Sequence, residues 1–354
     1  MEDYDFRSAF NEKYSINVKK IIRMLSENSR VSITEMARQL GVSRKTVENK
    51  IKKAEKEFGI KYTIELEEAA LGLDNPHLIL IKFIEKPDYN KIKEILTKSH
   101  IPQLAVTLNG TYDMFVYANA EDPNEYVYWD KTTQVLLSEY KASWQASDIA
   151  FKHLGFFPIR TVLIERLKIP KVYKDMLLLL NENSRMSFSE MSRRLGMKSN
   201  TLAYNFMKLK KMGYVKRFTI IITKPPELTM TSLFGKYIIV KGFEDDSMSM
   251  RKEITFMDDK IPLISRCLFS VQLVGSFDFF FVAAYDNANI GYSRLIKYYK
   301  QRYKKHGVKA MYGTIDKTLV GDFPTRNLDS KKEFNMIRWI PGIKPKVEKS
   351  DKLQ

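Results

Sequence analysis

Two short segments of the chain carry basic and amide side chains at helical spacing. In the first segment the outward-facing side chains are Arg44, Lys45, Asn49, Lys50 and Lys53. Guanidinium and ammonium groups bind phosphates or guanine acceptors, and an amide can pair with adenine. These residue types therefore favour the recognition of a nucleic acid.

Local signals delimit the helices that carry this first cluster. Ser32 and Glu35 have the S-x-x-E spacing of a capping box, in which the serine caps an amide and the glutamate reaches back. Apolar residues then repeat at helical spacing up to Gly41, which can take a positive φ and end the helix. Ser43 is a good N-cap for a second, basic helix. This order of elements predicts a helix-turn-helix motif.

The helix-turn-helix segment occurs twice in the chain. The sequence ENSR at residues 27–30 returns at residues 182–185, an offset of 155 positions. Further identities in the same register pair Ser32 with Ser187, Glu35 with Glu190, Met36 with Met191, Arg38 with Arg193, Gly41 with Gly196, Thr46 with Thr201 and Lys53 with Lys208. We interpret the chain as a tandem duplication.

The net charge of +17 is concentrated in these two segments. Residues 15–61 hold 12 Lys and Arg against 5 Glu, and residues 169–217 hold 11 Lys and Arg against 3 acidic residues. The segment from residue 331 onward adds 7 basic against 3 acidic residues, and the rest of the chain is slightly acidic. Charge placed in this way favours a polyanion bound at the helical modules; the alternative is a solvated basic face.

Composition excludes several classes of protein. With 354 residues, 44% of them hydrophobic, the chain can build several packed domains. Cys267 is the single cysteine, so no disulfide can form within the chain, which fits a reducing cytosol. The apolar runs are too short to span a bilayer, and the acidic N-terminus is unlike a signal peptide. We expect a cytoplasmic, nucleoid-associated protein without a membrane partner.

Motifs of the common enzyme classes are absent from the sequence. The four histidines, His77, His100, His153 and His306, lack metal-ligand spacing. No glycine-rich phosphate loop and no G-x-S-x-G elbow is present. We therefore expect no catalytic residue, no metal site and no cofactor.

After each helical module the hydrophobic pattern changes toward alternation. Residues 78–152 predict the order strand, helix, strand, strand, helix, strand, with Asn109-Gly110 as a hairpin turn. The same order is expected for residues 236–314, with Gly275 in the corresponding turn. The predicted fold class is α+β, a tandem duplication of a three-helix or winged helix-turn-helix domain followed by a ferredoxin-like βαββαβ sheet domain.

The domain limits follow from these changes of pattern. We expect helix-turn-helix domains at residues 1–62 and 166–224, sheet domains at 63–165 and 225–328, and a basic tail at 329–354. Consecutive prolines after residue 224 predict a hinge in front of the second sheet domain.

This combination of motifs resembles the Lrp/AsnC family of transcriptional regulators. The resemblance rests on ENSR, EMARQLGVS and a G-x-x-D motif at the third strand, Gly110 with Asp113 and Gly275 with Asp278. The ordinary family member has one such unit, so the chain resembles two fused units. The resemblance implies double-stranded DNA as partner, a homodimer or higher homo-oligomer through the sheet domains, and a small effector, commonly an amino acid, near the G-x-x-D turns. A glycine and an aspartate that only stabilise the turn are the alternative.

A recognition helix places its N-terminal residues against base edges in the major groove. The candidate DNA-binding residues of the first module are Arg38, Ser43, Arg44, Lys45, Thr46, Asn49, Lys50 and Lys53, of which Arg38 and Lys53 suit phosphates. Those of the second module are Arg193, Lys198, Ser199, Asn200, Thr201, Tyr204, Asn205 and Lys208.

The two modules differ at positions that would face DNA. Lys198 stands in place of the capping Ser43, Tyr204 in place of Asn49, and Asn205 in place of a lysine. We therefore expect two unlike half-sites, or one tight and one weaker module, held together at high effective concentration.

Two other functions stay open at this point. Siroheme decarboxylases share the same domain pair, sometimes in tandem, but they would need basic and histidine residues at the sheet interface, where this sequence has few. An architectural protein that binds DNA with little sequence preference would use the basic tail with Lys331, Lys332, Lys344, Lys346 and Lys349. The sequence also leaves open whether the sheet domains pair within one chain or between chains.

Overall fold

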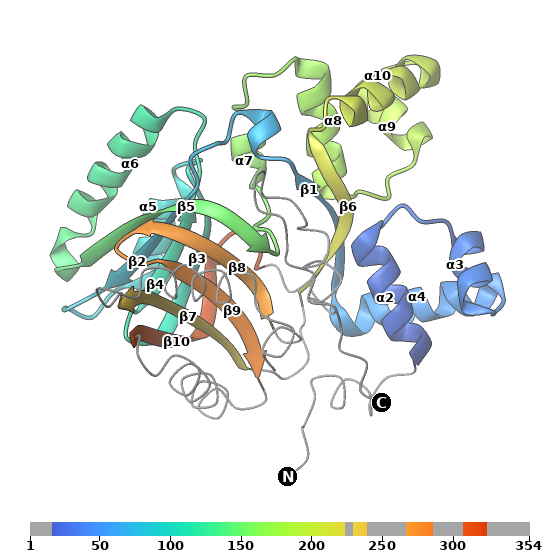
Figure 1. The fold of residues 1–354 in the computed structure, drawn as a ribbon. Helices are drawn as coiled ribbons and strands as arrows, with labels where there is room; N and C mark the ends of the chain where they lie inside the picture. The colour runs from blue at the N-terminus through green and yellow to red at the C-terminus, as the bar shows by residue number, and fades with distance from the viewer. Residues whose placement is uncertain (1–15, 224–228, 239–266, 286–306, 324–354) are drawn as a thin grey trace, which may run out of the picture.

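The computed structural model of the chain describes residues 16–223, 229–238, 267–285 and 307–323. These residues form two three-helix units, a two-stranded ribbon between the units, and a large antiparallel sheet flanked by helices (Figure 1). The helical units lie on one side of the molecule and the sheet lies on the other (Figure 1). The predicted α+β fold class is confirmed.

The first helical unit consists of α2 (Ile16–Glu27), α3 (Ile33–Leu40) and α4 (Arg44–Phe58). The predicted serine caps are present, because Ser32 Oγ accepts from the amide of Glu35 at 3.1 Å and Ser43 Oγ accepts from the amide of Thr46 at 3.1 Å. Gly41 ends α3 with a φ of 63°, a left-handed conformation that favours glycine. The tight turn between the helices therefore follows from short-range chemistry.

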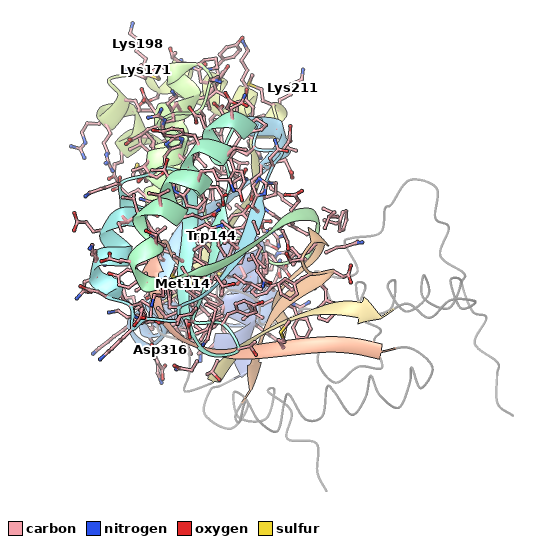
Figure 2. All side chains as sticks on the ribbon, turned by 90° about the vertical axis from the view of Figure 1, so that its left-hand side faces the viewer. Met114, Trp144, Lys171, Lys198, Lys211 and Asp316 are labelled. Carbon is pink, nitrogen blue, oxygen red and sulfur yellow. The ribbon has the colours of Figure 1, made fainter. Side chains whose placement is uncertain are left out.

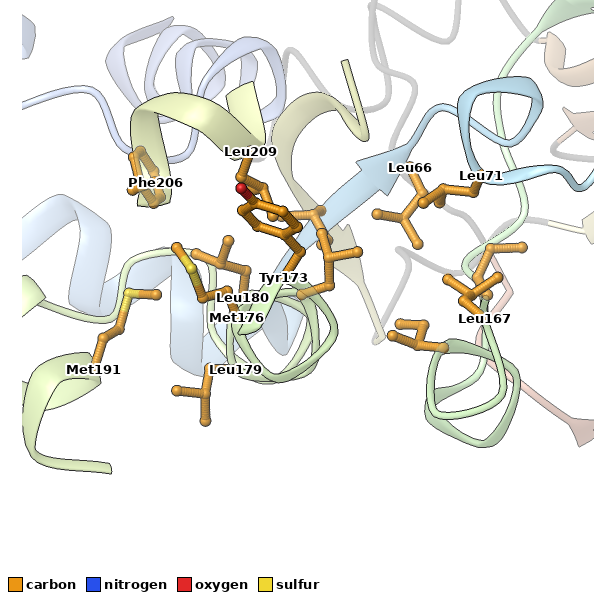
Figure 3. Packing of buried hydrophobic residues seen from close by; sticks show 14 of the residues in the cluster. Leu66, Leu71, Leu167, Tyr173, Met176, Leu179, Leu180, Met191, Phe206 and Leu209 are labelled. Carbon is orange, nitrogen blue, oxygen red and sulfur yellow. The ribbon is translucent and has the colours of Figure 1, made fainter. Parts of the chain in front are cut away.

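The second helical unit repeats this arrangement with α8 (Lys171–Glu182), α9 (Phe188–Leu195) and α10 (Ser199–Lys211). Ser187 Oγ caps the amide of Glu190 at 3.2 Å, but Lys198 begins α10 without a side-chain cap. The three helices pack around a core seen from close by in Figure 3, whose members include Tyr173, Met176, Leu180, Met191, Phe206 and Leu209.

An antiparallel ribbon of β1 (Ile60–Leu66) and β6 (Val215–Ile222) joins the two units, with Thr63 opposite Thr219 near its centre. Part of each strand packs against the helices of the other copy. The exchanged core residues are Ile64 and Leu66 from β1 and Ile220 and Ile222 from β6. The expected limit between residues 62 and 63 thus falls inside β1, because this strand belongs to both cores.

The first half of the sheet follows the predicted βαββαβ order. It consists of β2 (His77–Lys82), α5 (Tyr89–Thr97), β3 (Pro102–Gly110), β4 (Met114–Ala118), α6 (Pro123–Leu136) and β5 (Ser143–Leu154). Alternate side chains of β2 face the two sides, with Ile79 and Ile81 in the core under the helices and Leu78 and Leu80 in the opposite core. Both faces of β2 are buried, which agrees with the continuous apolar run of this segment in the sequence.

The first hairpin differs from the prediction. Asn109 and Gly110 were expected in the turn, but β3 continues through Gly110 and the turn follows at residues 111–113. Pairing of Gly110 with Gly313 in a neighbouring strand extends β3 by these two residues. Two short helical segments are not predicted, η1 (Ala69–Leu71) and α7 (Thr161–Ile164). The helix expected from Pro123 to Glu139 is divided into α6 and η2 (Ser138–Tyr140).

The second half of the sheet contributes β7 (Thr229–Ile238), β8 (Cys267–Gly275), β9 (Phe279–Tyr285) and β10 (Gly307–Val320). β10 is longer than predicted, because it pairs with β7 of its own copy and also with β3 of the other copy. The helices expected at residues 248–257 and 290–306, the hinge after residue 224 and the tail at 329–354 lie outside the described residues.

The two halves join within the chain. β10 pairs with β3 and β5 pairs with β8, so eight of the ten described strands close into a barrel in the order β10-β3-β4-β2-β5-β8-β9-β7. Their shared core includes Leu80, Phe115, Tyr117, Phe157, Phe269 and Phe280. The rings of Phe157 and Phe269 lie 3.9 Å apart between centroids. The question left open by the sequence is thereby answered, since the sheet domains pair with each other in one chain.

Candidate nucleic-acid interface

α4 presents its polar face to solvent because its other face is anchored in the first helical core. The buried anchors are Val47, Ile51, Ala54 and Phe58. Of the predicted DNA-binding residues in this module, Arg38, Ser43, Arg44, Lys45, Asn49 and Lys53 are exposed, whereas Thr46 and Lys50 are half-buried. The helix therefore offers a polar, mostly cationic surface that a polyanion can reach.

Arg38 is already engaged by a carboxylate. Its guanidinium donates to both oxygens of Glu35, at 2.7 and 3.0 Å, and Gln39 donates to the same group at 2.6 Å. The predicted return of Glu35 to the helix cap is wrong, because these side-chain donors compete for its carboxylate. The hydrogen bond from Arg38 lowers the pKa of Glu35. A phosphate would have to compete with Glu35 for Arg38.

α10 presents a different surface at the corresponding place. Leu202, Phe206 and Leu209 hold its inner face in the second core. Of the predicted DNA-binding residues, Arg193, Lys198, Ser199, Asn200, Thr201, Tyr204 and Lys208 are exposed, whereas Asn205 is half-buried. The ammonium of Lys208 lies 4.8 Å from the ring centroid of Tyr204. A hydrogen bond with the Tyr204 side chain raises the pKa of Lys208. Lys198 and Lys211, at the two ends of α10, extend from the top of the molecule (Figure 2).

The repeated ENSR sequences meet each other between the two modules. The hydroxyl oxygens of Ser29 and Ser184 lie 2.6 Å apart, and both serines are fully buried. The amide of Ser29 donates to the carbonyl of Phe218 at 3.0 Å, and the amide of Ser184 donates to that of Tyr62 at 3.4 Å. The repeat in the sequence is therefore an interface in the fold, related by a local pseudo-twofold axis.

Threonines of the ribbon extend this pseudo-symmetry. Thr63 Oγ1 donates to the carbonyl of Asn181 at 3.2 Å, and Thr219 Oγ1 donates to that of Ser26 at 2.7 Å. Ser26 and Asn181 are equivalent positions at the offset of 155 residues. Each copy thus contacts the helices of the other copy through its ribbon strand, β1 or β6. These contacts fix the two recognition helices relative to each other.

Arg30 is a functional candidate that sequence reasoning missed. Its Nη1 donates to the carbonyls of Ser184 and Met186, at 2.7 and 3.2 Å. Its guanidinium carbon lies 5.4–5.6 Å from the ring centroids of Phe188, Phe206 and Phe218. Burial, and to a lesser degree the charge of Arg185, lowers the pKa of Arg30. The ENSR identity marked the position, but no periodicity reveals its contacts in the other copy.

The G-x-x-D turns lie where the two halves of the sheet meet. Asp113 is held on both oxygens, by Lys82 Nζ at 2.7 Å and by the amide of Phe83 at 2.7 Å. Gly275 has a φ of 126° and lies opposite Ser147 of the first copy. The amide of Leu273 donates to the carbonyl of Asp278 at 2.9 Å. These contacts favour a structural role in the turns, and effector binding there stays a prediction.

A partly buried polar cluster lies beside β4 and β5. Glu68 accepts from Lys152 Nζ at 2.5 Å, from the hydroxyl of Tyr117 at 2.6 Å and from the amide of Asn119 at 2.7 Å. Burial, followed by the charge of Glu68, raises the pKa of Tyr117. The cluster connects η1 with β4 and β5, and pattern reasoning gave no sign of it.

Two largely buried histidines lie in the sheet domain, each beside a carboxylate. His77 Nδ1 lies 2.8 Å from the carboxylate of Asp148, and its ring stacks on Tyr126 at 3.5 Å between centroids. His100 pairs with Glu125 at 3.2 Å. In the part of the chain that the structure describes, no three His, Cys, Asp or Glu residues are placed to hold a metal ion. Among the same residues no helix has the length and apolarity needed to cross a bilayer.

Comparisons with known proteins agree with this geometry. A family model described as an HTH domain matches residues 17–70, and one described as winged helix-turn-helix DNA-binding matches residues 174–216. An uncharacterized HTH-type transcriptional regulator of Pyrococcus abyssi is 34% identical over 113 residues, which cover 31% of this chain and 76% of the relative. The chain belongs to the family of HTH-type transcriptional regulators.

One solved structure resembles the chain at the level of the fold over most of its length, and others match part of it. The siroheme decarboxylase NirDL has a TM-score of 0.57 and 10% identity, over 90% of this chain and 96% of that protein. LrpC of Bacillus subtilis matches 39% of this chain and 96% of its own length, with 23% identity and a TM-score of 0.35. The first likeness shows that an arrangement of two fused units occurs in another protein.

Proposed function

We propose that the chain is a transcriptional regulator that binds specific double-stranded DNA with two unlike helix-turn-helix modules. One observation carries this proposal. Two helices that expose cations and amides on their outer faces, α4 and α10, are held on one chain by a buried interface of equivalent residues. A single chain would therefore present both modules as a homodimer of ordinary regulators does, but with two different surfaces.

Loss of two cations from α4 tests the proposal. Arg44→Ala with Lys45→Ala should weaken binding of a DNA duplex and lower the slope of log affinity against log salt by about 1 to 2, because each lost phosphate contact removes about one released counterion. Binding is measured by fluorescence anisotropy at several salt concentrations. Lys93→Ala, at an exposed lysine of α5, is the control. Unchanged affinity and an unchanged slope in the double variant would remove α4 as a reader.

The finer assignment to the Lrp/AsnC type rests on the described order of elements in the first copy and on the order that the sequence predicts for the second. That assignment brings with it a small effector, commonly an amino acid, at the G-x-x-D turns, and an oligomer. Since the described strands close within one chain, a second copy would have to attach to another surface. Light scattering with and without DNA measures the number of chains, and thermal shifts with the common amino acids test the effector. A regulator of this kind acts in the cytoplasm, at the nucleoid.

The whole-chain likeness to a siroheme decarboxylase favours a second candidate, an enzyme that holds a tetrapyrrole between the sheet domains. The described residues between the half-sheets favour the regulator over the enzyme. Phe115, Tyr117, Phe157, Phe269 and Phe280 are in contact there, and their core is apolar. A titration with an iron porphyrin, followed by absorption, distinguishes the two functions: saturable binding together with weak DNA binding would favour the enzyme.

A further inference from the structure

The middle of one exposed side of α10 is apolar, whereas the equivalent positions of α4 carry charged and amide side chains. Positions three and four apart lie on one side of a helix, and on α10 this side carries Asn200, Ala203, Tyr204, Met207 and Lys211, all of them exposed. The equivalent side of α4 carries Lys45, Glu48, Asn49, Lys52 and Lys56. Three charged or amide side chains of the first module are thus replaced by an alanine, a tyrosine and a methionine.

This apolar stripe is open to solvent. Tyr204 is 60% exposed and Met207 is 65% exposed, and Met212 beyond the helix end is 44% exposed. Single exposed apolar residues are ordinary, but neighbours on one helix face mark a binding surface. Among the described residues no large exposed hydrophobic side chain lies on α4.

Cations surround the stripe. Lys198 lies at the start of α10, Lys208, Lys210 and Lys211 lie in its last turn, and Arg193 is exposed on α9. These cations could bind the phosphates on both sides of a DNA groove. The apolar stripe between them could contact an apolar group on the floor of the groove. A purely apolar partner would leave these cations without counter-charges. The charge around the stripe therefore favours DNA as its occupant.

We propose that α10 selects a thymine-rich half-site by contact of Ala203, Tyr204 and Met207 with thymine methyl groups. This inference rests on the proposed function and specifies its second reader. In the major groove thymine is the base that presents a methyl group, and apolar side chains read it by contact. α4, with Arg44 and Lys45 in its first turn, would read guanine acceptors instead. The two half-sites then differ in composition because the two helices differ in polarity.

Replacement of thymine by uracil tests the inference, since uracil lacks only the methyl group. The probe is the tightest duplex that this chain enriches from a random pool, made with uracil in one half-site at a time. Uracil in the α10 half should weaken binding about fourfold for each contacted methyl, the affinity equivalent of burying one methylene-sized group. Uracil in the α4 half should change affinity less than about twofold on the same scale.

Exchange variants show which residues are responsible. Tyr204→Asn with Met207→Lys gives α10 the residues of α4, and this variant should still bind the duplex but lose the difference between thymine and uracil. Lys52→Met, the reverse exchange in α4, is the matched control and should keep the uracil effect in the α10 half. Circular dichroism confirms that both variants are folded.

Two results would overturn the inference without touching the first reader. One is an equal affinity for thymine and uracil in the α10 half; the other is absence of protection there in a footprint that covers the α4 half, which would assign the stripe to a protein partner. Failure of the whole proposed function would differ from both, because then no duplex would be enriched at all.

Discussion

Arg30 shows how one side chain can set the relation between two modules. It is half-buried, donates to two carbonyls of the other copy and lies over three of its aromatic rings. A charged donor in such a place stabilises its acceptors, and three rings favour the cation further. Arg30, which the sequence alone would place at the surface, is thus part of the interface that orients both recognition helices.

Arg30→Ala should lower the free energy of unfolding by about 1 to 3 kcal/mol, because two carbonyls lose a charged donor. Relief of repulsion with Arg185 offsets part of this loss. The expected effect on DNA is a loss of preference for one spacing between half-sites, with binding of a single half-site retained. Urea unfolding and anisotropy with duplexes of different spacing measure the two effects.

Arg23→Ala is the control for this variant, because Arg23 makes an exposed ion pair with Glu27 one turn away in α2. Such pairs contribute about 0.3 to 0.5 kcal/mol. An Arg30 variant as stable as the control, with an unchanged preference for spacing, would contradict the role of Arg30.

His77 makes stability depend on pH. Burial lowers its pKa, and the carboxylates of Asp148 and Asp130 oppose this shift only in part. A histidine with a lowered folded pKa contributes full stability above its ordinary pKa, and this stability is lost as the pH falls from there toward the folded pKa. The free energy of unfolding should therefore decrease between about pH 7 and about pH 5.

His77→Asn should reduce this decrease, because asparagine can replace the Nδ1 donor toward Asp148 and does not titrate. His100 retains a similar dependence, since burial also lowers its pKa. Urea unfolding at several pH values compares the variant with the parent chain. Parallel curves for the two proteins would show that His77 does not titrate in this range.

At the scale of elements, the joint between the half-sheets is the critical feature. β10 ends at Val320, and Gly321 then passes close to β3, where a Cβ on Gly321 would lie 2.1 Å from the carbonyl oxygen of Gln103. Its φ is 73°. Both the backbone conformation and the lack of space therefore require glycine at position 321, directly after β10.

Gly321→Ala should destabilise the chain by about 1 to 3 kcal/mol more than Gly72→Ala, because only Gly321 adds a collision with backbone to the cost of the left-handed conformation. Gly72 has a φ of 74°, and a Cβ added to it would meet no atom within 4 Å, so it is a matched control. Midpoints of urea unfolding measure the difference. Equal midpoints would mean that β10 does not run against β3.

Short-range chemistry made most elements predictable from the sequence. The caps at Ser32 and Ser43, the glycine at position 41 and the apolar run of β2 are each read from a few neighbouring residues. The exchange of β1 and β6, the length of β10 and the cluster around Glu68 depend on partners far along the chain, which one sequence does not show. The exposure of most candidate DNA-binding residues could be predicted because it follows the helical period. The contacts of Arg30 between the two modules could not be predicted in this way.

At the scale of the whole molecule, duplication makes one chain into a pseudo-dimer. The ribbon and the closed sheet are built from both copies, so the two copies are connected at two places. A symmetric dimer presents the same binding surface on both subunits, whereas the two copies of a fused pair can evolve different binding surfaces. The polarity difference between α4 and α10 is the feature that such freedom permits.

The most direct measurement is selection of bound sequences from a random duplex pool at physiological salt, with the absorption spectrum of the purified protein recorded alongside. We predict one motif with two unlike half-sites at a fixed spacing, and no tetrapyrrole absorption. Tight binding without a motif would contradict the account in favour of an architectural DNA binder. Weak binding by a protein that takes up a tetrapyrrole would contradict it in favour of the enzyme.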